Sequence, residues 1–213
     1  MTTVWGPLGW MMLHSVATSY PENPTQSEKS LLYSWLDLFR DTITCATCKG
    51  HFSEMLQIYR TKFPNMLASR QDFAIFSFRA HNAVNKRLSK PIYSSVDECM
   101  SLLKGNIRNN TSSGFRVSYI NHITRYWKTL QDVSGIVALK KILEMKRIEI
   151  EYISSRDTSF AISILPDVVV LPSDALEHRT EASRPRGLFG IQQPGVNARV
   201  GLQLGVGGFR IRR

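Results

Sequence analysis

Residues 41–51 read DTITCATCKGH, and this stretch decides how the rest of the chain is interpreted. Cys45 and Cys48 are separated by two residues, in a chain whose only other cysteine is Cys99. Such a close pair of thiols is half of a metal site, a redox-active disulfide, or two side chains that are neighbours by accident. Most of what the sequence indicates about function depends on which of these is right.

The spacing of the two thiols suits a redox role. Residues at positions i and i+3 can lie side by side on the first turn of a helix, where the peptide dipoles stabilise a thiolate. Lys49 adds a positive charge beside the pair. A thiolate at that place can attack a disulfide, and the oxidised pair can accept attack from a substrate thiol. Thioredoxin-like proteins do this on a βαβ scaffold, which this sequence does not predict, so another electron acceptor would be needed.

Zinc binding is the alternative reading of the same stretch. Cys45, Cys48 and His51 stand at plausible ligand spacings, and Cys99 is a candidate for the fourth ligand of a tetrahedral site. Strong zinc signatures, however, contain two close pairs of ligands, and this chain has one. A zinc-binding module therefore stays open as an alternative.

The composition indicates a protein with one core and an appended segment. The chain has 213 residues, of which 43% are hydrophobic, and a formal net charge of +10. The basic excess lies mainly toward the C-terminus, where residues 182–213 contain six arginines and neither an acidic residue nor a lysine. That end should attract an acidic partner or serve as an assembly contact, because opposite charge favours association.

The cysteine content and the hydropathy of the sequence indicate in which cellular compartment the protein resides. Three cysteines are too few for a disulfide-stapled secreted fold. The apolar residues 5–16 lack the basic start of a signal peptide, and the apolar residues 160–172 are interrupted by Pro166 and Asp167. We therefore expect no transmembrane segment and a cytoplasmic protein.

Hydrophobic periodicity and capping signals predict a mainly α fold. Thr25 and Glu28 form a capping box, as do Ser95 and Glu98, and Pro91 should end the helix before it. The expected helices cover residues 7–17, 25–39, 45–59, 69–89, 95–103, 117–130 and 136–153. Residues 105–114, GNIRNNTSSG, are polar and turn-forming, so they are the candidate boundary.

This boundary gives a predicted domain organisation. Residues 1–104 form the first domain, 105–114 a linker, 115–175 a helical C-terminal region, and 176–213 a basic arm rich in glycine and arginine. The apolar segment 160–172 is expected either as a pair of short strands or as an extended stretch lying on the domain.

Four sequence blocks together identify a family. They are WGPLGWMMLH (5–14), SYPENPT (19–25), CATCKGHF (45–52) and HNAVNKRLSKP (81–91). In this order and at these distances they closely resemble the FAD-linked sulfhydryl oxidases of the Erv/ALR type. The resemblance covers about residues 5–95, a little under half of the chain, and its blocks are specific in combination.

The resemblance implies a compact helical bundle that binds FAD and pairs as a homodimer. It implies that Cys45 and Cys48 form the active disulfide, with Cys48 against the flavin and Cys45 exposed to substrate. Electrons would pass from a protein dithiol to this pair, then to FAD, then to molecular oxygen, which gives a disulfide and hydrogen peroxide. The flavin carries the redox chemistry, and the protein positions it.

The cofactor contacts implied by the resemblance come from three of the blocks. Taken one at a time, a histidine or tryptophan of this kind is more often a core residue, and only the joint pattern favours a binding site. The implied cofactor-binding residues are Gly6, Trp10, His14, Tyr20, Phe52, His81, Asn82, Asn85 and Lys90.

Two departures from the family pattern concern cysteines. The family's second, structural disulfide falls here on Phe78 and Ser95, so we infer that it is absent and that Phe78 packs in an apolar environment. Its loss would cost about 2–4 kcal/mol of stability unless other packing, such as that of the C-terminal half, compensates. Many members also carry a relay cysteine pair, which Cys99 alone cannot supply; a buried core thiol is the favoured reading of Cys99.

These two departures affect how substrate thiols would reach the active disulfide and which kind of organism the protein comes from. Either protein thiols meet Cys45–Cys48 directly, or a relay dithiol belongs to another protein. Members poor in such shuttles occur in large DNA viruses, which makes a viral protein of the host cytoplasm and virion plausible. The rival interpretations are a structural or assembly protein that keeps the oxidase fold, with a basic tether, and the zinc module.

Overall fold

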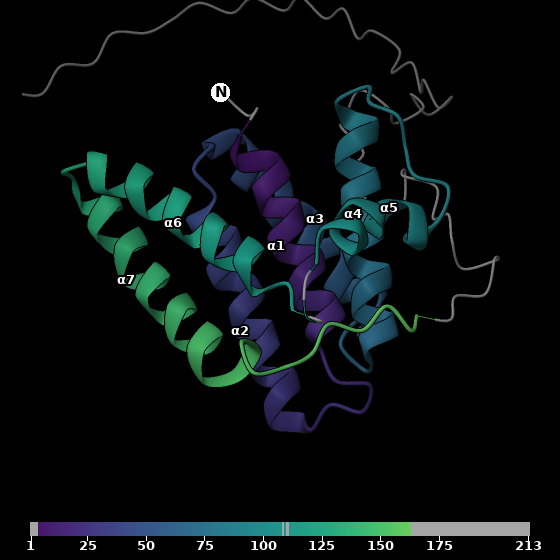
Figure 1. Ribbon diagram of the computed structural model, residues 1–213. Helices are drawn as coiled ribbons and strands as arrows, with labels where there is room; N and C mark the ends of the chain where they lie inside the picture. The colour runs from purple at the N-terminus through teal and green to yellow at the C-terminus, as the bar shows by residue number, and fades with distance from the viewer. Residues whose placement is uncertain (1–3, 108, 110, 163–213) are drawn as a thin grey trace, which may run out of the picture. The chain divides into compact units, whose positions relative to one another are not determined.

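A computed structural model describes residues 4–107, 109 and 111–162 (Figure 1). These residues form seven α-helices and one short π-helix, with no strand among them. In chain order the elements are α1 (Trp5–Ser19), α2 (Gln26–Thr42), α3 (Ala46–Lys62), α4 (Arg70–Arg87), α5 (Val96–Asn106), α6 (Ser113–Thr129), α7 (Val133–Ile148) and the π-helix η1 (Glu149–Ile153). The prediction of a mainly α fold is confirmed.

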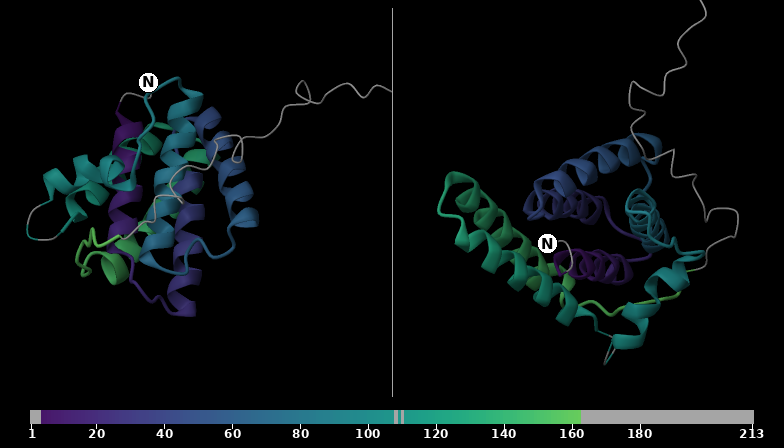
Figure 2. Two further views of the ribbon diagram at one scale, coloured as in Figure 1. Left: turned by 90° about the vertical axis from the view of Figure 1, so that its right-hand side faces the viewer. Right: turned by 90° about the horizontal axis from the view of Figure 1, so that it is seen from above.

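The first helix, α1, forms the centre of the packing. Its sequence is apolar on all sides, and every residue from Met11 to Ser19 is buried. It contacts both α4 and α6, and in the view from above it lies between them (Figure 2). A residue of α1 can therefore meet partners from widely separated parts of the chain.

The second helix begins with the capping box that the sequence predicts. The Thr25 side chain accepts a hydrogen bond from the backbone N–H of Glu28, and the Glu28 carboxylate accepts one from the backbone N–H of Thr25 at 2.7 Å. The apolar face of α2 is buried through Leu32, Trp35 and Phe39. This face joins α2 to the common core that also takes in α1 and α3.

The C-terminal helices pack onto the first ones. The helix α6 contacts α1, and α7 contacts α2. The indole N–H of Trp127 donates to the backbone carbonyl of Thr42 at 2.9 Å, and Lys141 forms an ion pair with Asp41. The stretch expected as a linker contains the end of α5 and the start of α6, which begins four residues before the expected helix. The division into domains at that stretch stays a prediction.

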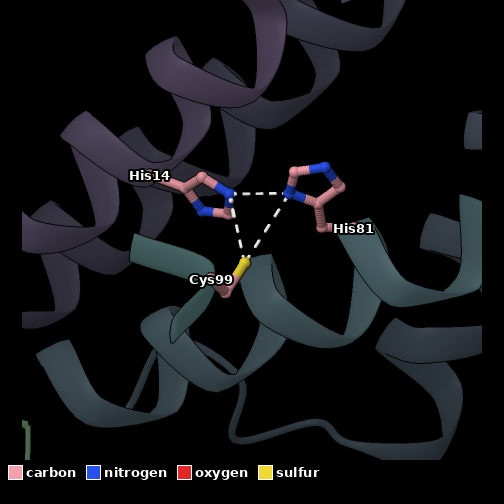
Figure 3. Close-up of side chains that lie close together, drawn as sticks. All are labelled: His14, His81 and Cys99. Atoms are coloured by element: carbon pink, nitrogen blue, oxygen red, sulfur yellow. Dashed lines mark hydrogen bonds between the residues drawn. The ribbon is translucent and has the colours of Figure 1, made fainter. Parts of the chain in front are cut away.

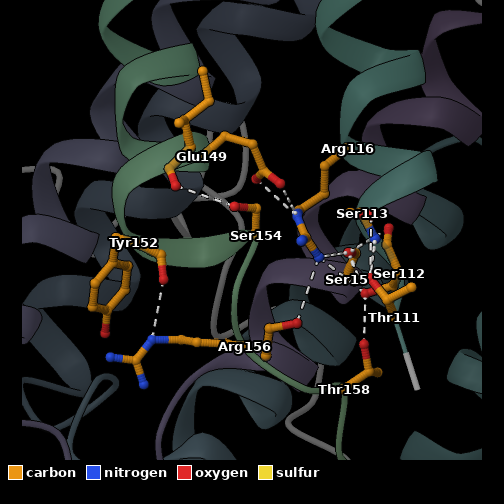
Figure 4. A network of polar contacts seen from close by, with 12 residues as sticks. Ser15, Thr111, Ser112, Ser113, Arg116, Glu149, Tyr152, Ser154, Arg156 and Thr158 are labelled. Atoms are coloured by element: carbon orange, nitrogen blue, oxygen red, sulfur yellow. Dashed lines mark hydrogen bonds and ion pairs between the residues drawn. The ribbon is translucent and has the colours of Figure 1, made fainter. Parts of the chain in front are cut away.

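A buried ion pair fastens α6 and η1 to α1 (Figure 4). The Nε atom of Arg116, a completely buried residue, donates to both carboxylate oxygens of Glu149, at 2.8 and 2.9 Å. Its Nη1 atom donates to the hydroxyls of Ser15 and Ser112, at 2.7 and 3.0 Å. Burial raises the pKa of the Glu149 carboxyl above its ordinary value, while Arg116 acts in the opposite direction.

Phe78 packs in an apolar environment, as the sequence predicts. It is 1% exposed and forms a small second core with Val96, Cys99 and other apolar residues of α4 and α5. Phe160 and Ile162, from the C-terminal half, pack against this cluster. Packing by the C-terminal half is thus present at the place where the family's structural disulfide is missing.

Of the two hydrogen bonds in the capping box predicted for Ser95 and Glu98, one is present. The Ser95 side chain caps α5 by accepting from the backbone N–H of Glu98. The Glu98 carboxylate, however, accepts from the backbone N–H and the hydroxyl of Ser94, both at 2.6 Å, one residue earlier than expected. The neighbouring serine offers two donors to the carboxylate, where the backbone of Ser95 offers one.

Parts of the predicted C-terminal region fall outside the described residues. Residues 160–162 belong to no helix or strand, and the backbone N–H of Ile162 donates to the carbonyl of Phe160 at 2.8 Å. The rest of the apolar segment and the basic arm lie beyond the described chain. Among the residues that are described, no helix is both long and apolar enough to span a bilayer.

Candidate functional site

The two thiols of the CATC stretch form a disulfide at the start of α3. Cys45 is the N-cap residue of this helix, and its Sγ accepts a hydrogen bond from the backbone N–H of Cys48 at 3.2 Å. The two Cα atoms are 5.2 Å apart. Both residues are partly exposed, and Cys48 packs against the main core. The predicted placement of the pair on the first turn of a helix is confirmed.

Aromatic packing against α2 holds the helix that carries the disulfide. Phe52, one of the predicted site residues, is buried and makes an edge-on contact with Phe39 of α2, with ring centroids 5.5 Å apart. Phe39 in turn stacks on Trp35. This aromatic column joins α3 to α2 and so fixes the direction of the first turn of α3. In the described structure Phe52 is a core residue that supports the disulfide.

A second group of predicted site residues forms a stack of rings. Trp10 and His81 are nearly parallel, with centroids 4.2 Å apart and an interplanar angle of 10°. His14 lies at the edge of His81, with ring centroids 5.2 Å apart and Nε2 of His14 3.0 Å from Nδ1 of His81. Trp10 and His81 are partly exposed, whereas His14 is 1% exposed. The structure thus brings together residues that are 67 positions apart in the sequence.

The two histidines are electrically neutral at physiological pH. Burial lowers the pKa of His14 to about 4. Burial also lowers the pKa of His81 to about 2, with further contributions from His14 and from the charge of Lys90. The effect of Lys90 places a cation within electrostatic reach of the stacked rings.

Cys99 lies beside the two histidines (Figure 3). Its Sγ is 3.5 Å from Nε2 of His14 and 3.6 Å from Nδ1 of His81. Cys99 is 5% exposed, and burial raises the pKa of its thiol to about 12. The expectation of a buried thiol is confirmed.

The zinc alternative, as stated for Cys45, Cys48, His51 and Cys99, is wrong. In the described part of the chain the one group that unites three or more potential metal ligands contains His14, His81 and Cys99. The close pair of cysteines forms a disulfide instead of offering two thiolates.

Asn82 and Asn85 fix the segment that follows α4. The Asn82 amide donates to the backbone carbonyl of Tyr93 and accepts from its N–H, both at 2.9 Å. Asn85 is 7% exposed and donates to the carbonyl of Pro91 at 3.1 Å. These bonds place the 91–93 segment next to the ring stack, where Tyr93 meets His81 edge-on.

The remaining predicted site residues have distinct surroundings. A Cβ atom added at Gly6 would contact nothing within 4 Å, so no steric demand for glycine is present at this position. Tyr20 is buried, and its hydroxyl donates to the carbonyl of Leu67 at 3.0 Å. Lys90 is exposed. Tyr20 therefore has a structural role, and the cofactor contacts proposed for Gly6, Tyr20 and Lys90 stay predictions.

The site contains one residue that sequence reasoning missed and one whose role it did not assign. Ser77 is buried and lies 3.2 Å from Nδ1 of His14. Its position four residues before His81 on the same helix was the available signal, because residues i and i+4 share a face. Cys99 had no such signal, since its approach to His14 depends on how α5 packs against α1.

Comparison with known proteins gives a consistent family. The sequence model of the Erv1/Alr family matches residues 8–103. An FAD-linked sulfhydryl oxidase of African swine fever virus is 38% identical over 111 residues, which are 52% of this chain and 88% of that protein. A probable FAD-linked sulfhydryl oxidase of Acanthamoeba polyphaga mimivirus is 32% identical over 138 residues, covering 65% of this chain and 95% of its own length.

A solved structure is also similar to this chain. The crystal structure of the yeast Erv1 core shares 29% sequence identity with it, over 51% of this chain and 87% of that one, with a TM-score of 0.43. The matched region of the family model contains both the disulfide and the ring stack.

Proposed function

The chain belongs to the Erv1/Alr family, and on this premise we propose that it is an FAD-dependent thiol oxidase whose redox pair is Cys45–Cys48. The observation that carries the proposal is the disulfide at the N-terminus of α3, within the region matched by the family. The relatives' names, FAD-linked sulfhydryl oxidase, supply the expected activity.

The surroundings of the two sulfurs favour different roles for them. Cys45 caps the helix and is not part of the main core, whereas Cys48 packs against that core. A substrate thiolate would attack the Sγ of Cys45, which forms a mixed disulfide and releases Cys48 as a thiolate. The peptide dipoles at the N-terminus of the helix favour this developing negative charge.

A second substrate thiol completes the exchange. It attacks the mixed disulfide at the substrate sulfur, the substrate leaves as a disulfide, and Cys45 is released as a thiol. Two substrate thiols have then lost two electrons and two protons, and the enzyme's pair has gained them. The Cys45–Cys48 disulfide would re-form as the reduced pair gives up these two electrons. FAD, when bound, would supply the acceptor and the chemistry that passes them on to molecular oxygen as hydrogen peroxide.

The described residues fit a flavin dinucleotide chemically. Trp10 and His81 present flat, partly exposed aromatic rings of the kind on which an adenine or flavin ring can stack. Lys90, which acts electrostatically on His81, is a cation suited to a pyrophosphate. Asn82 and Asn85 would serve by holding the segment that ends at Tyr93 beside the rings. We therefore assign Trp10, His81 and Lys90 to binding and the two asparagines to positioning.

The number of cysteines limits the ways in which electrons can pass from substrate thiols to the Cys45–Cys48 pair. The full sequence contains three cysteines, and Cys99 is buried beside two histidines. The chain therefore has no second pair of its own to relay electrons from a substrate. We propose that protein thiols reach Cys45–Cys48 directly or through a dithiol on another protein. Assembly as a homodimer remains a prediction.

Oxygen consumption tests the proposed activity. The purified full-length chain, saturated with FAD, should consume oxygen and produce hydrogen peroxide when a reduced dithiol protein is added, and substrate disulfides should form in equal amount. Omission of the dithiol is the matched control. A flavin-loaded chain that forms no disulfide in any reduced protein offered would favour the rival interpretation of a structural protein that keeps the fold.

A further inference from the structure

Three potential metal ligands meet at one point where α1, α4 and α5 come together (Figure 3). The Nε2 atom of His14 lies 3.0 Å from Nδ1 of His81. The Sγ atom of Cys99 lies 3.5 Å from the first nitrogen and 3.6 Å from the second. These atoms form a small triangle in which each side chain presents one atom to the other two.

The triangle has the size of one face of a tetrahedral zinc site. Bond lengths of about 2.0–2.1 Å for nitrogen and about 2.3 Å for sulfur place two nitrogens about 3.3 Å apart, and a nitrogen and a sulfur about 3.6 Å apart. The observed nitrogen–sulfur separations of 3.5 and 3.6 Å match this geometry, and the nitrogen–nitrogen separation of 3.0 Å is slightly short of it. The three separations thus agree with one ion's ligand set to within a few tenths of an ångström.

The hydrogen bond behind His14 gives its ring the required tautomer. The hydroxyl of Ser77 donates its proton to the carbonyl of Ala74 at 2.9 Å. With the hydroxyl proton on that carbonyl, the contact of 3.2 Å between Ser77 Oγ and His14 Nδ1 is donated by the histidine. In this arrangement His14 Nε2 carries a lone pair, which accepts a hydrogen bond from Nδ1 of His81 across 3.0 Å. Metal-binding histidines usually have their second nitrogen fixed in this way.

We propose that His14, His81 and Cys99 form a binding site for a thiophilic transition-metal ion, with Zn²⁺ as the fitting ion. On binding, the Cys99 thiol releases its proton to solvent and its sulfur bonds to the ion. His14 contributes the lone pair of Nε2, and His81 contributes that of Nδ1 after the proton of this nitrogen moves to its Nε2. The oxidation state of the ion does not change. Three protein ligands leave the fourth position of the tetrahedron for a water molecule or another small ligand.

The proposed ion would bind at the edge of the His81 ring. Trp10 stacks on the flat face of His81, whereas metal bonds lie in the ring plane along the nitrogen lone pairs. An ion at the triangle would fix the ring orientation of His81 through its edge. The inference is independent of the thiol oxidase activity, because it rests on Cys99 and two in-plane nitrogens.

Cobalt(II) provides the decisive test, because thiolate–cobalt bonds give an intense charge-transfer band. In the oxidised full-length protein, Cys45 and Cys48 are locked in a disulfide, so Cys99 is the one thiol that can produce that band. The protein should bind one cobalt ion per chain with this band, and equimolar Zn²⁺ should remove it. Elemental analysis after dialysis should then find one zinc per chain.

Two variants separate this site from the rest of the molecule. Cys99→Ser should lose the cobalt band and the bound zinc while its circular dichroism and flavin content stay as in the parent. The control His122→Gln, on α6 outside the triangle, should keep both signals. Absence of the thiolate band in the unaltered protein, or zinc retained in Cys99→Ser, would overturn the proposal. Normal flavin binding in that event would leave the proposed oxidase function untouched.

Discussion

The Sγ atom of Cys45 accepts a hydrogen bond from the backbone N–H of Cys48, 3.2 Å away, while the two sulfurs are joined in a disulfide. One helix end thus supplies both the geometry of the bond and a donor to one of its sulfurs. Cys45 lies at the cap and Cys48 toward the core, so the pair has an outer and an inner sulfur. This asymmetry is the structural basis of the division of labour proposed for the two cysteines.

Serine substitutions should distinguish the outer from the inner sulfur. Each of Cys45→Ser and Cys48→Ser should lower turnover by more than about a thousandfold, because each removes an essential sulfur of the exchange. Offered the substrate in its disulfide form, Cys48→Ser should accumulate a mixed disulfide between Cys45 and substrate, visible by mass spectrometry, as the Cys45 thiolate displaces one substrate thiol, whereas Cys45→Ser should not. Thr47→Ala, at an exposed position between them, is the control and should retain full activity. The reverse trapping pattern would refute the assignment of roles.

The buried histidines should make the fold sensitive to acid. His14 has a pKa of about 6.5 when unfolded and about 4 when folded, so the unfolded state binds more protons between these values. Its contribution to stability is complete above pH 6.5 and is lost as the pH falls toward 4, at up to about 1.4 kcal/mol per pH unit. His81 acts in the same direction down to about pH 2.

Urea unfolding from pH 7 to pH 5, with a chelator present, measures this effect. The free energy of unfolding should fall more steeply for the parent protein than for His14→Gln, which cannot take up the proton. Equal slopes for the two proteins would contradict the assignment of a buried neutral histidine.

The buried ion pair should be costly to break and cheaper to replace. Arg116→Met should destabilise the protein by about 3–5 kcal/mol, because it leaves the Glu149 carboxylate buried without its partner. The double variant with Glu149→Met should recover much of that loss. Arg147→Met is the matched control, since its pairs with Glu144 and Glu151 are exposed, and it should cost less than about 1 kcal/mol. Denaturant unfolding checks all three, and a double variant no better than Arg116→Met would refute this reading.

Two glycines should respond to alanine in opposite ways. A Cβ at Gly135 would lie 2.2 Å from the carbonyl oxygen of Leu130, so Gly135→Ala should destabilise the α6–α7 hairpin by about 2 kcal/mol or more. Gly50 lies within α3 with nothing within 4 Å of its Cβ position, and Gly50→Ala should stabilise by about 0.5–1 kcal/mol. Thermal unfolding would contradict this account if both variants shifted the midpoint in the same direction.

The helices were predictable because their signals are local. The Thr25–Glu28 capping box, the buried face of α2 and the end of α4 ahead of Pro91 each depend on a few neighbouring residues. The start of α6 at Ser113 was missed, because the polar, turn-forming residues before it carry no apolar periodicity. The hydrogen-bond donor to the Glu98 carboxylate was predicted as Ser95 and is Ser94, one residue earlier. The sequence alone does not show which of two neighbouring serines donates.

The site residues that belong to the family's sequence blocks could be predicted. The contacts between segments that are distant in the sequence could not. The i and i+3 spacing of Cys45 and Cys48 already places both on one helical turn. The meeting of Cys99 with His14 spans 85 positions and depends on the packing of α5 against α1. The use of Asn82 to hold Tyr93 likewise requires the path of the loop, which residue identity alone does not give.

The visible absorption spectrum of the purified, desalted protein tests the central claim most directly, followed by anaerobic addition of a reduced dithiol. The account predicts a bound oxidised-flavin band that bleaches on reduction and returns when air is admitted, and that does not bleach in Cys48→Ser on the same time scale. A correctly folded protein without flavin, or a flavin band in the parent that the dithiol cannot bleach, would contradict electron transfer through Cys45–Cys48.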